Sequence, residues 1–335
     1  MHHVNVGYRQ IFANTKKLPF GKILGVGAIL AFMIMMLINP DYYLDSARRG
    51  LSLYATSVLP SLFPFYFCSL LLTKIGAAKT ISALGAKPVK LLFNAPKESA
   101  YILILSMMSG YPIGASMTAE LYQNGTISKR EAKCIAAFAS TSGPIFILGT
   151  VGSAIFNDGR IGAIILAAHY LGAMLNGLIF RMRKRADDTD RPIRIASYDD
   201  LLAETISNST LSMLYVGGYI VLCGMLIDTL KLFNIDALML SKLGENAAQP
   251  IISLLFGSIE MTRGAIECAK CTATPLGIAL CAGIISLGGL SVTFQNYTFL
   301  SKCGMSFASV AIRKIVQAAL GFAIALGLAY IFGFR

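Results

Sequence analysis

The sequence predicts an all-α polytopic membrane protein that is built from two inverted repeats. Of its 335 residues, 55% are hydrophobic and 14% are charged, and the mean hydropathy is +0.65. Soluble domains carry about 25% charged residues, and a single soluble core stops growing near about 250–300 residues. The apolar residues also form long runs, and the order of these runs recurs after about 154 residues. A lipid bilayer is therefore expected to be the main solvent of this chain.

The first 43 residues predict an N-terminal tail and a first transmembrane helix. Basic residues precede an apolar run over 23–38, at Arg9, Lys16, Lys17 and Lys22. This order is typical of a secretory signal, but no small-residue cleavage site follows before Asn39 and Pro40. The segment is therefore expected to remain as an uncleaved span.

Each repeat is expected to begin with an interfacial helix that leads into a span. In the first repeat, a stretch of mixed polarity begins at Asp45 and precedes the apolar run 59–73. In the second repeat, a similar stretch begins at Asp199 and precedes the run 211–230. Mixed polarity at helical spacing indicates a helix that lies in the membrane interface. The predicted boundaries are repeat 1 at 44–182, a cytoplasmic linker at 183–197 and repeat 2 at 198–335.

A short hairpin follows in each repeat. In the first repeat, the arms 98–109 and 112–124 flank the turn Ser109-Gly-Tyr-Pro-Ile-Gly-Ala. In the second repeat, the turn is Gly257-Ser-Ile-Glu-Met-Thr-Arg-Gly-Ala. An arm of about 12 residues is about 18 Å long, whereas the hydrocarbon core is about 30 Å thick. Each hairpin is therefore predicted to be re-entrant, so that it enters and leaves the membrane on the same side.

A broken transmembrane helix and a last long span complete each repeat. The breaks are Ser140-Thr-Ser-Gly-Pro and Ser286-Leu-Gly-Gly-Leu-Ser, and the last spans follow at 161–179 and 307–332. In repeat 1, a proline comes shortly after a glycine both in the hairpin and in the broken span, as expected where one helix ends and another begins. Such a broken span crosses the membrane with an unwound middle.

Charge placement supports an inverted topology. Three crossings in each repeat turn the second repeat upside down relative to the first, which is a pattern of secondary transporters. With the first helix, this makes seven crossings, with the N-terminus inside and the C-terminus outside. Of the 29 Lys and Arg residues, 21 fall in predicted inner segments and 7 in outer ones, and Arg263 alone is placed near the midplane. This distribution agrees with the positive-inside rule.

The breaks are also the predicted substrate site. Non-helical backbone at membrane depth persists only where it faces protein or a water-filled cavity, and half-helix N-termini attract anions. The candidate substrate-binding residues are Ser109, Gly110, Tyr111, Pro112, Gly114, Thr141, Ser142, Gly143, Glu260, Thr262, Arg263, Gly288, Gly289 and Ser291. The alternative is that these glycines and prolines only allow helices to pack closely.

Arg263 gives the most specific hypothesis about the substrate. A charged Arg at membrane depth is unfavourable by about 2.5–3.5 kcal/mol, so we expect it to have a function. Its guanidinium matches the two oxygens of a carboxylate and therefore predicts a small organic anion as the substrate. The alternative is a structural ion pair with Glu260, which lies three residues earlier.

Other classes of function find little support. The basic residues lie in short clusters without interleaved aromatic residues, so nucleic acid is not an expected partner. The sequence has no Walker loop, nucleophile elbow or His/carboxylate metal spacing, and His169 stands alone on an apolar span. Cys268 and Cys271 form a lone C-x-x-C, which is a weak metal or redox signal. We therefore expect a chain that is not an enzyme, uses no metal or cofactor and has its substrate and the bilayer as partners. The sequence leaves the coupling ion and oligomer formation open.

Three motifs resemble a known family. The two hairpin turns and Thr141-Ser-Gly-Pro-Ile-Phe-Ile-Leu-Gly-Thr-Val-Gly resemble the sporulation integral membrane proteins of the YlbJ type, within the nucleoside-recognition Gate-domain group. The likeness covers about residues 44–332. It implies a fold similar to that of concentrative nucleoside transporters. It also implies that dipicolinic acid moves across the outer forespore membrane of an endospore-forming bacterium. A pyridine with two carboxylates would suit half-helix N-termini, Arg263 and Tyr111.

Alternatives to a dipicolinate transporter stay open. The short linker between the repeats leaves room for another organic anion, and for the cell membrane as the location. The Gate-domain likeness also allows a nucleoside carrier, which would bind its substrate through Asn, Gln and Glu side chains. A third alternative is a sporulation membrane scaffold that transports nothing and uses its broken helices to bind a partner protein.

Overall fold

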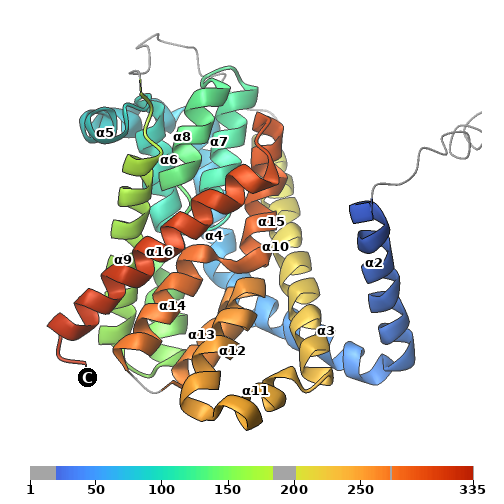
Figure 1. Ribbon diagram of the computed structural model, residues 1–335. Helices are drawn as coiled ribbons and strands as arrows, with labels where there is room; N and C mark the ends of the chain where they lie inside the picture. The colour runs from blue at the N-terminus through green and yellow to red at the C-terminus, as the bar shows by residue number, and fades with distance from the viewer. Residues whose placement is uncertain (1–19, 184–200, 272–273, 335) are drawn as a thin grey trace, which may run out of the picture. The chain divides into compact units, whose positions relative to one another are not determined.

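The computed structural model describes residues 20–183, 201–271 and 274–334, and its regular elements in these ranges are all helical (Figure 1). The predicted tail before residue 20 and the predicted linker from residue 184 onward lie outside the described residues. Within the described ranges, six helices are long and apolar enough to cross a membrane. The chain is therefore an integral, multi-pass membrane protein. It divides into two units, 1–46 and 47–335, which are described separately.

The first unit contains helix α2 (Phe20–Ile38) and the start of α3 (Pro40–Leu53). Helix α2 coincides with the predicted first transmembrane helix: apart from Lys22 near its start it is apolar, and it is long enough to cross a bilayer. Within this unit, the ring of Phe32 packs edge-on against that of Tyr43, with 5.8 Å between the ring centres.

The predicted interfacial helices are continuous with the spans that follow them. Helix α3 passes through the π-helical turn η1 (Tyr54–Val58) into α4 (Leu59–Lys74), so residues 40–74 form one helical segment. In the second half, α10 (Leu201–Leu232) is a single helix of 32 residues. Polar residues in these segments bond back to the helix itself, as Thr56 does to the carbonyl of Ser52, and so do not interrupt it.

Two short helix pairs occupy the positions of the predicted hairpins. In the first, α6 (Glu98–Ser109) and α7 (Ile113–Gln123) are joined by three residues that include a cis peptide bond between Tyr111 and Pro112. In the second, α12 (Glu245–Ile259) and α13 (Met261–Ala269) are separated by the single extended residue Glu260. The helical arms and their turns are therefore confirmed, and their re-entrant placement in the membrane stays a prediction.

Both predicted breaks are present. Helix α8 (Lys129–Phe138) ends before an irregular segment over 139–143, after which the π-helix η2 (Ile145–Ile155) begins. Helix α14 (Pro275–Leu287) is separated from α15 (Gly289–Leu300) by a change of direction at Gly288 and Gly289, whose φ angles are +75° and +67°. Neither α8 nor η2 is long enough to cross a membrane alone, so the total of seven crossings stays a prediction.

The last helix of each half packs against the other. Helix α9 (Gly159–Ile179) and helix α16 (Phe307–Ile331) cross in Figure 1, and they approach closely at two glycines. A Cβ atom built on Gly172 would lie 3.1 Å from the backbone nitrogen of Gly321, so these glycines permit the close contact. The sequence predicts an inverted relationship between the halves, and this contact joins elements that correspond in that scheme.

The sequence analysis assigned no helix to two further segments. Helix α5 (Ala77–Phe93) follows α4, and helix α11 (Ile235–Leu243) follows α10. Helix α5 contributes Phe93, whose ring stacks on that of Phe138 with 4.2 Å between the ring centres.

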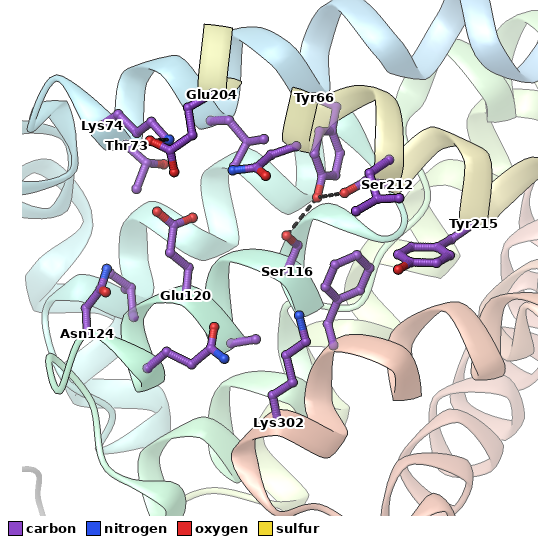
Figure 2. Close-up of a pocket in the computed structure, with 17 residues that line it drawn as sticks. Tyr66, Thr73, Lys74, Ser116, Glu120, Asn124, Glu204, Ser212, Tyr215 and Lys302 are labelled. Atoms are coloured by element: carbon purple, nitrogen blue, oxygen red, sulfur yellow. Dashed lines mark hydrogen bonds and ion pairs between the residues drawn. The ribbon is translucent and has the colours of Figure 1, made fainter. Parts of the chain in front are cut away.

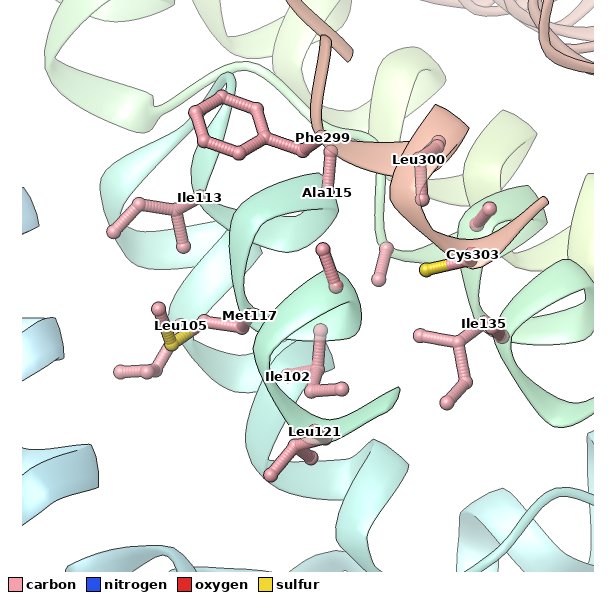
Figure 3. Close-up of a cluster of buried hydrophobic side chains, with 14 of the residues drawn as sticks. Ile102, Leu105, Ile113, Ala115, Met117, Leu121, Ile135, Phe299, Leu300 and Cys303 are labelled. Carbon is pink, nitrogen blue, oxygen red and sulfur yellow. The ribbon is translucent and has the colours of Figure 1, made fainter. Parts of the chain in front are cut away.

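A hydrophobic cluster anchors the first hairpin to the second half of the chain (Figure 3). Ile113 and Ala115 of α7 are buried in the same cluster as Phe299 and Leu300 of α15. The 3₁₀ turn η4 (Ser301–Cys303) contributes the buried Cys303. The position of the first hairpin is thus fixed by residues nearly 200 positions later in the chain, at 299–303.

Candidate functional site

In each half, the tip of the hairpin lies against the break of the neighbouring helix. A Cβ atom on Gly110 would lie 2.5 Å from the nitrogen of Gly143, and one on Gly114 would lie 1.6 Å from the carbonyl oxygen of Ala139. In the second half, a Cβ atom on Gly289 would lie 2.8 Å from the carbonyl oxygen of Gly257. The predicted glycines of these breaks therefore bring two backbones into direct contact.

Hydrogen bonds connect the breaks of the two halves. The side-chain amide of Asn296 donates to Ser140 Oγ at 3.0 Å, and the Tyr111 hydroxyl donates to the carbonyl of Ile285 at 3.2 Å. The backbone N–H of Ser142 donates to His169 Nε2 at 2.8 Å. The four sequence segments that contain these groups therefore meet in one polar cluster.

His169 bridges the two breaks. Its Nε2 accepts from the Ser142 amide, so in a neutral ring the proton is on Nδ1, which lies 2.8 Å from Ser286 Oγ. The side chain is completely buried. His169 is therefore a hydrogen-bonded core residue that holds the Ser142 backbone against the second break.

Lys314 is a functional candidate that the sequence analysis missed. Its ammonium donates to the Tyr111 hydroxyl at 2.7 Å, to Gln317 Oε1 at 3.0 Å and to the Ser140 carbonyl at 3.3 Å. The residue is 2% exposed, and within the described ranges no Asp or Glu side chain forms an ion pair with it. A buried ammonium without a counter-ion is rare in a membrane-spanning helix and indicates a functional site.

The sequence predicted Arg263 alone near the membrane midplane, and the structure places a second basic residue, Lys314, beside the breaks. In the charge count, Lys314 was placed among the inner charges, together with Lys302 and Arg313. Helix α16 begins at Phe307, so Arg313 and Lys314 lie inside the helix, about two turns from its start. Arg313 bonds to the carbonyls of Lys133 and Ser309, whereas Lys314 faces the breaks. The position of Lys314 two turns inside the apolar run 307–332 is the sequence signal that could have identified it as a buried basic residue.

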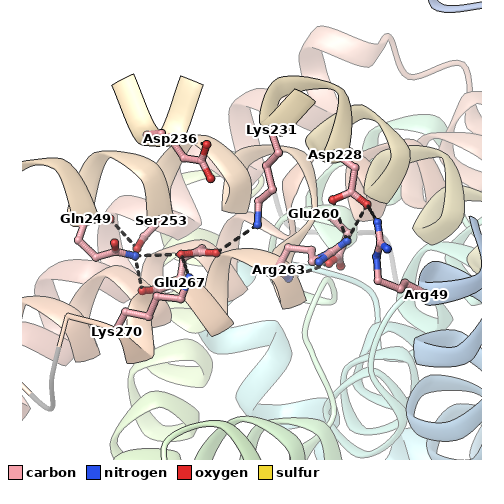
Figure 4. Close-up of polar contacts among 11 residues, drawn as sticks. Arg49, Asp228, Lys231, Asp236, Gln249, Ser253, Glu260, Arg263, Glu267 and Lys270 are labelled. Carbon is pink, nitrogen blue, oxygen red and sulfur yellow. Dashed lines mark hydrogen bonds and ion pairs between the residues drawn. The ribbon is translucent and has the colours of Figure 1, made fainter. Parts of the chain in front are cut away.

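Arg263 forms an ion pair that the sequence did not predict. Its guanidinium lies 3.1 Å from the carboxylate of Asp228 on α10, and Arg49 lies 2.9 Å from the same carboxylate (Figure 4). Glu260, the partner considered from the sequence, accepts hydrogen bonds from the backbone amides of Thr262 and Arg263 and so caps α13. The positive end of α13 is therefore already occupied by a buried carboxylate.

A small cavity lies between the two hairpin tips. It has a volume of about 30 Å³, and five predicted site residues line it: Tyr111, Ser142, Glu260, Thr262 and Ser291. Two other predicted residues hydrogen-bond within the first half of the chain. Ser109 hydrogen-bonds to Ser69 at 3.2 Å, and Thr141 hydrogen-bonds to Ser106 at 2.9 Å. Room for little more than a water molecule indicates a closed central site.

A much larger cavity, which no sequence pattern indicated, lies between α4, α7 and α10. Its volume is about 570 Å³, and it is lined by the Lys74–Glu204 ion pair, Glu120 and Lys302 (Figure 2). At one side of this cavity, the Tyr66 hydroxyl hydrogen-bonds to Ser116 at 2.7 Å and to Ser212 at 2.8 Å. The lining residues come from separate elements, so no local motif marks them.

Comparison with known proteins agrees with the resemblance of the motifs. The chain is 29% identical over 311 residues to the sporulation integral membrane protein YlbJ of Bacillus subtilis (strain 168), and the match covers 83% of this chain and 76% of that protein. It is 31% identical over 126 residues to an uncharacterized protein of Alkalihalophilus pseudofirmus, over 36% of this chain and 27% of that protein. No protein-family model and no solved structure matches the chain. The comparison with YlbJ confirms the resemblance: the chain is similar to a sporulation integral membrane protein of the YlbJ type.

Proposed function

We propose that this protein is a membrane transporter of a small organic anion, with dipicolinic acid as the first candidate, and that it is not an enzyme. The proposal takes its substrate from the resemblance to YlbJ-type sporulation proteins. It takes its site from the polar cluster at the helix breaks. The proposed location is the outer forespore membrane, with the N-terminus in the cytoplasm.

The observation that carries the choice of an anion is the environment of Lys314. Its buried ammonium has neutral partners, and the neighbouring Gln317 Nε2 is buried without a hydrogen-bond partner. A buried donor that lacks a partner is unfavourable by about 1–3 kcal/mol, so such groups usually bind water or a ligand. A carboxylate would neutralise the ammonium and accept from the unpaired amide. These two groups favour an anion over an uncharged nucleoside.

The breaks give such a site the properties that transport needs. Secondary transporters bind substrates near the membrane midplane, between repeats whose helices are interrupted. In this protein, Tyr111 belongs to the first hairpin, and Lys314 belongs to the last helix of the second half. A movement between the two halves would therefore change the distance between the groups that we propose to bind the anion.

We assign Arg263 a supporting role in this site. Because Asp228 neutralises its guanidinium, Arg263 is less available to a carboxylate than Lys314. The inverted repeats, the re-entrant hairpins and the likeness to concentrative nucleoside transporters belong to the same proposal. They describe how the two halves would alternate around the central cavity.

Uptake by proteoliposomes tests the proposed function. The purified full chain is reconstituted, and the initial uptake of labelled dipicolinate is compared with that of labelled uridine. An anion transporter takes up dipicolinate and not uridine, whereas a nucleoside carrier gives the reverse result. Uptake of neither compound above protein-free liposomes would favour another anion or the scaffold. Direct uptake of other labelled organic anions in a second assay separates those two alternatives.

A further inference from the structure

Three cavities follow one another along the contact between α10 and the helical segment 47–74. The two helices pack against each other, and they contribute residues to the cavities in opposite chain order. The large cavity is bordered by residues 66–74 of one helix and 204–215 of the other. The central cavity is bordered by 58–62 and by Val216 and Ile220.

The third cavity continues this order toward Asp228. Its volume is about 140 Å³, and Arg49, Leu53 and Gly224 are among the residues that line it. Ile220 and Glu260 line both this cavity and the central one, so the two are neighbours. The large and central cavities are separated by one helical turn on each helix, between Leu62 and Tyr66 and between Ser212 and Val216.

We infer that this helix contact is the permeation path of the protein and that the large cavity is its access vestibule. This inference rests on the proposed function, since it supplies the route by which the organic anion reaches the central site. Tyr66 forms the barrier between the vestibule and the central site, and the Arg49–Asp228–Arg263 cluster forms the barrier at the opposite end.

The geometry of Tyr66 explains how the first barrier is held closed. The ring is 1% exposed, and its hydroxyl connects Ser116 on α7 with Ser212 on α10. These hydrogen bonds join the first hairpin to the second half of the chain. Movement of Tyr66 out of this position would connect the vestibule with the central cavity.

The charges along the path fit an anion that passes without being trapped. The vestibule contains two lysines and two glutamates, Lys74, Lys302, Glu120 and Glu204, so its formal charges balance. Its volume of about 570 Å³ lies within the range of about 300–1,000 Å³ that small-molecule pockets occupy. At the far end, Arg49 and Arg263 share one carboxylate. An arriving anion would compete with Asp228 for these two guanidinium groups.

Cysteine labelling tests the path without requiring a substrate. All seven native cysteines lie in the described residues and none of them is in a disulfide; the two that are not buried, Cys68 and Cys271, are replaced by serine in the background protein. Single cysteines are then placed in the vestibule (Asn208→Cys), in the central cavity (Ser61→Cys) and in the third cavity (Ile266→Cys). An exposed apolar position on α10 outside the cavities, Ile206→Cys, is the control. The full chain in proteoliposomes is treated with a membrane-impermeant maleimide from each side separately.

We expect Asn208→Cys and Ile266→Cys to react from opposite sides, and Ser61→Cys to be protected while Tyr66 is present. Tyr66→Phe removes two neutral hydrogen bonds, so it should raise the labelling rate of Ser61→Cys about tenfold from the Asn208 side. Tyr66→Ala should raise the rate further, and Ile206→Cys should not respond to either change. Size-exclusion profiles identify variants that do not fold, and Tyr66→Phe keeps the ring as the conservative test.

Two results would overturn the inference. One is equal labelling of Ser61→Cys in proteins with and without Tyr66, which would show that Tyr66 is not a barrier. The other is labelling of Asn208→Cys and Ile266→Cys from the same side, which would show that the three cavities do not form a path across the membrane. Because labelling reports water access, it succeeds or fails independently of dipicolinate uptake. A failed path and a failed substrate assignment are therefore distinguishable.

Discussion

The ammonium of Lys314 donates a hydrogen bond of 2.7 Å to the hydroxyl of Tyr111 and also lies 4.5 Å from the centre of its ring. The lysine is on the last helix of the chain, and the tyrosine is at the tip of the first hairpin. A positive charge over an aromatic face is stabilised by the electrons of the ring. This contact holds the buried charge in place at the meeting point of the two halves.

Replacement of Lys314 should abolish most transport. Lys314→Gln keeps a hydrogen-bonding side chain but removes the charge that we propose to attract the anion. We expect the initial rate of dipicolinate uptake to fall by at least about tenfold, which corresponds to about 1.4 kcal/mol. Lys242→Gln removes an exposed lysine on α11 and is the matched control. Full uptake by a well-folded Lys314→Gln protein would reject the assignment.

The Asp228 cluster predicts unequal effects of removing its members. Asp228→Asn leaves two guanidinium groups without their shared carboxylate, whereas Arg263→Gln still leaves Asp228 paired with Arg49. We therefore expect Asp228→Asn to lower the thermal unfolding temperature more than Arg263→Gln does. The double variant Asp228→Asn/Arg263→Gln should have a higher unfolding temperature than Asp228→Asn alone, since the two residues interact directly.

Uptake by the same variants separates structure from substrate binding. If Arg263 only pairs with Asp228, the double variant should transport better than Asp228→Asn alone. If Arg263 binds the anion, Arg263→Lys should lower uptake and Arg263→Ala should lower it further, with membrane insertion unchanged. Normal uptake by a well-expressed Arg263→Ala protein would exclude that binding role.

Close contact between hairpin and break predicts that Gly114 tolerates no side chain. Gly114→Ala would place its Cβ 1.6 Å from the carbonyl oxygen of Ala139, so the hairpin would have to move. Overpacking of this kind destabilises proteins by about 1–3 kcal/mol. Gly149→Ala is the control, because no atom lies within 4 Å of a Cβ at that position. Equal unfolding temperatures for the two variants would contradict the close contact.

Topology reporters at the C-terminus and in the predicted linker between the repeats test the topology that the charge distribution predicts. A reporter fused after Arg335 should be external, and one inserted at Asp187 should be cytoplasmic. This result follows from seven crossings and the positive-inside distribution of Lys and Arg. A cytoplasmic C-terminal reporter, or an external one at Asp187, would contradict the inverted repeats.

The hairpins and breaks were predictable because their signals are local. Glycine and proline interrupt helices through their own backbone geometry, so the turn at 109–115 and the break at 140–144 are visible in a single sequence. The continuity of residues 40–74 was not predictable in the same way. Polar residues near Asp45 are typical of an interfacial helix, and local composition does not determine whether the following span continues it.

The residues of the candidate site likewise divide into those with a local sequence signal and those that depend on tertiary structure. Tyr111, Ser142 and Glu260 lie at local breaks and were predicted, and they line the central cavity. Lys314 was missed because its position facing the breaks depends on how α16 packs against other helices. The pairing of Arg263 with Asp228 joins residues 35 positions apart on different helices, so it too depends on tertiary structure.

The initial rate of labelled dipicolinate uptake shows whether the protein transports an organic anion through a site that contains Lys314. It is measured in parallel with the unchanged chain, with Lys314→Gln and with protein-free liposomes, at equal amounts of inserted protein. For an anion transporter that binds its substrate through Lys314, we expect saturable uptake by the unchanged chain that unlabelled dipicolinate inhibits and uridine does not, and near-background uptake by Lys314→Gln. Equal rates for the unchanged chain and Lys314→Gln, or uptake that uridine inhibits as strongly as dipicolinate, would contradict this expectation.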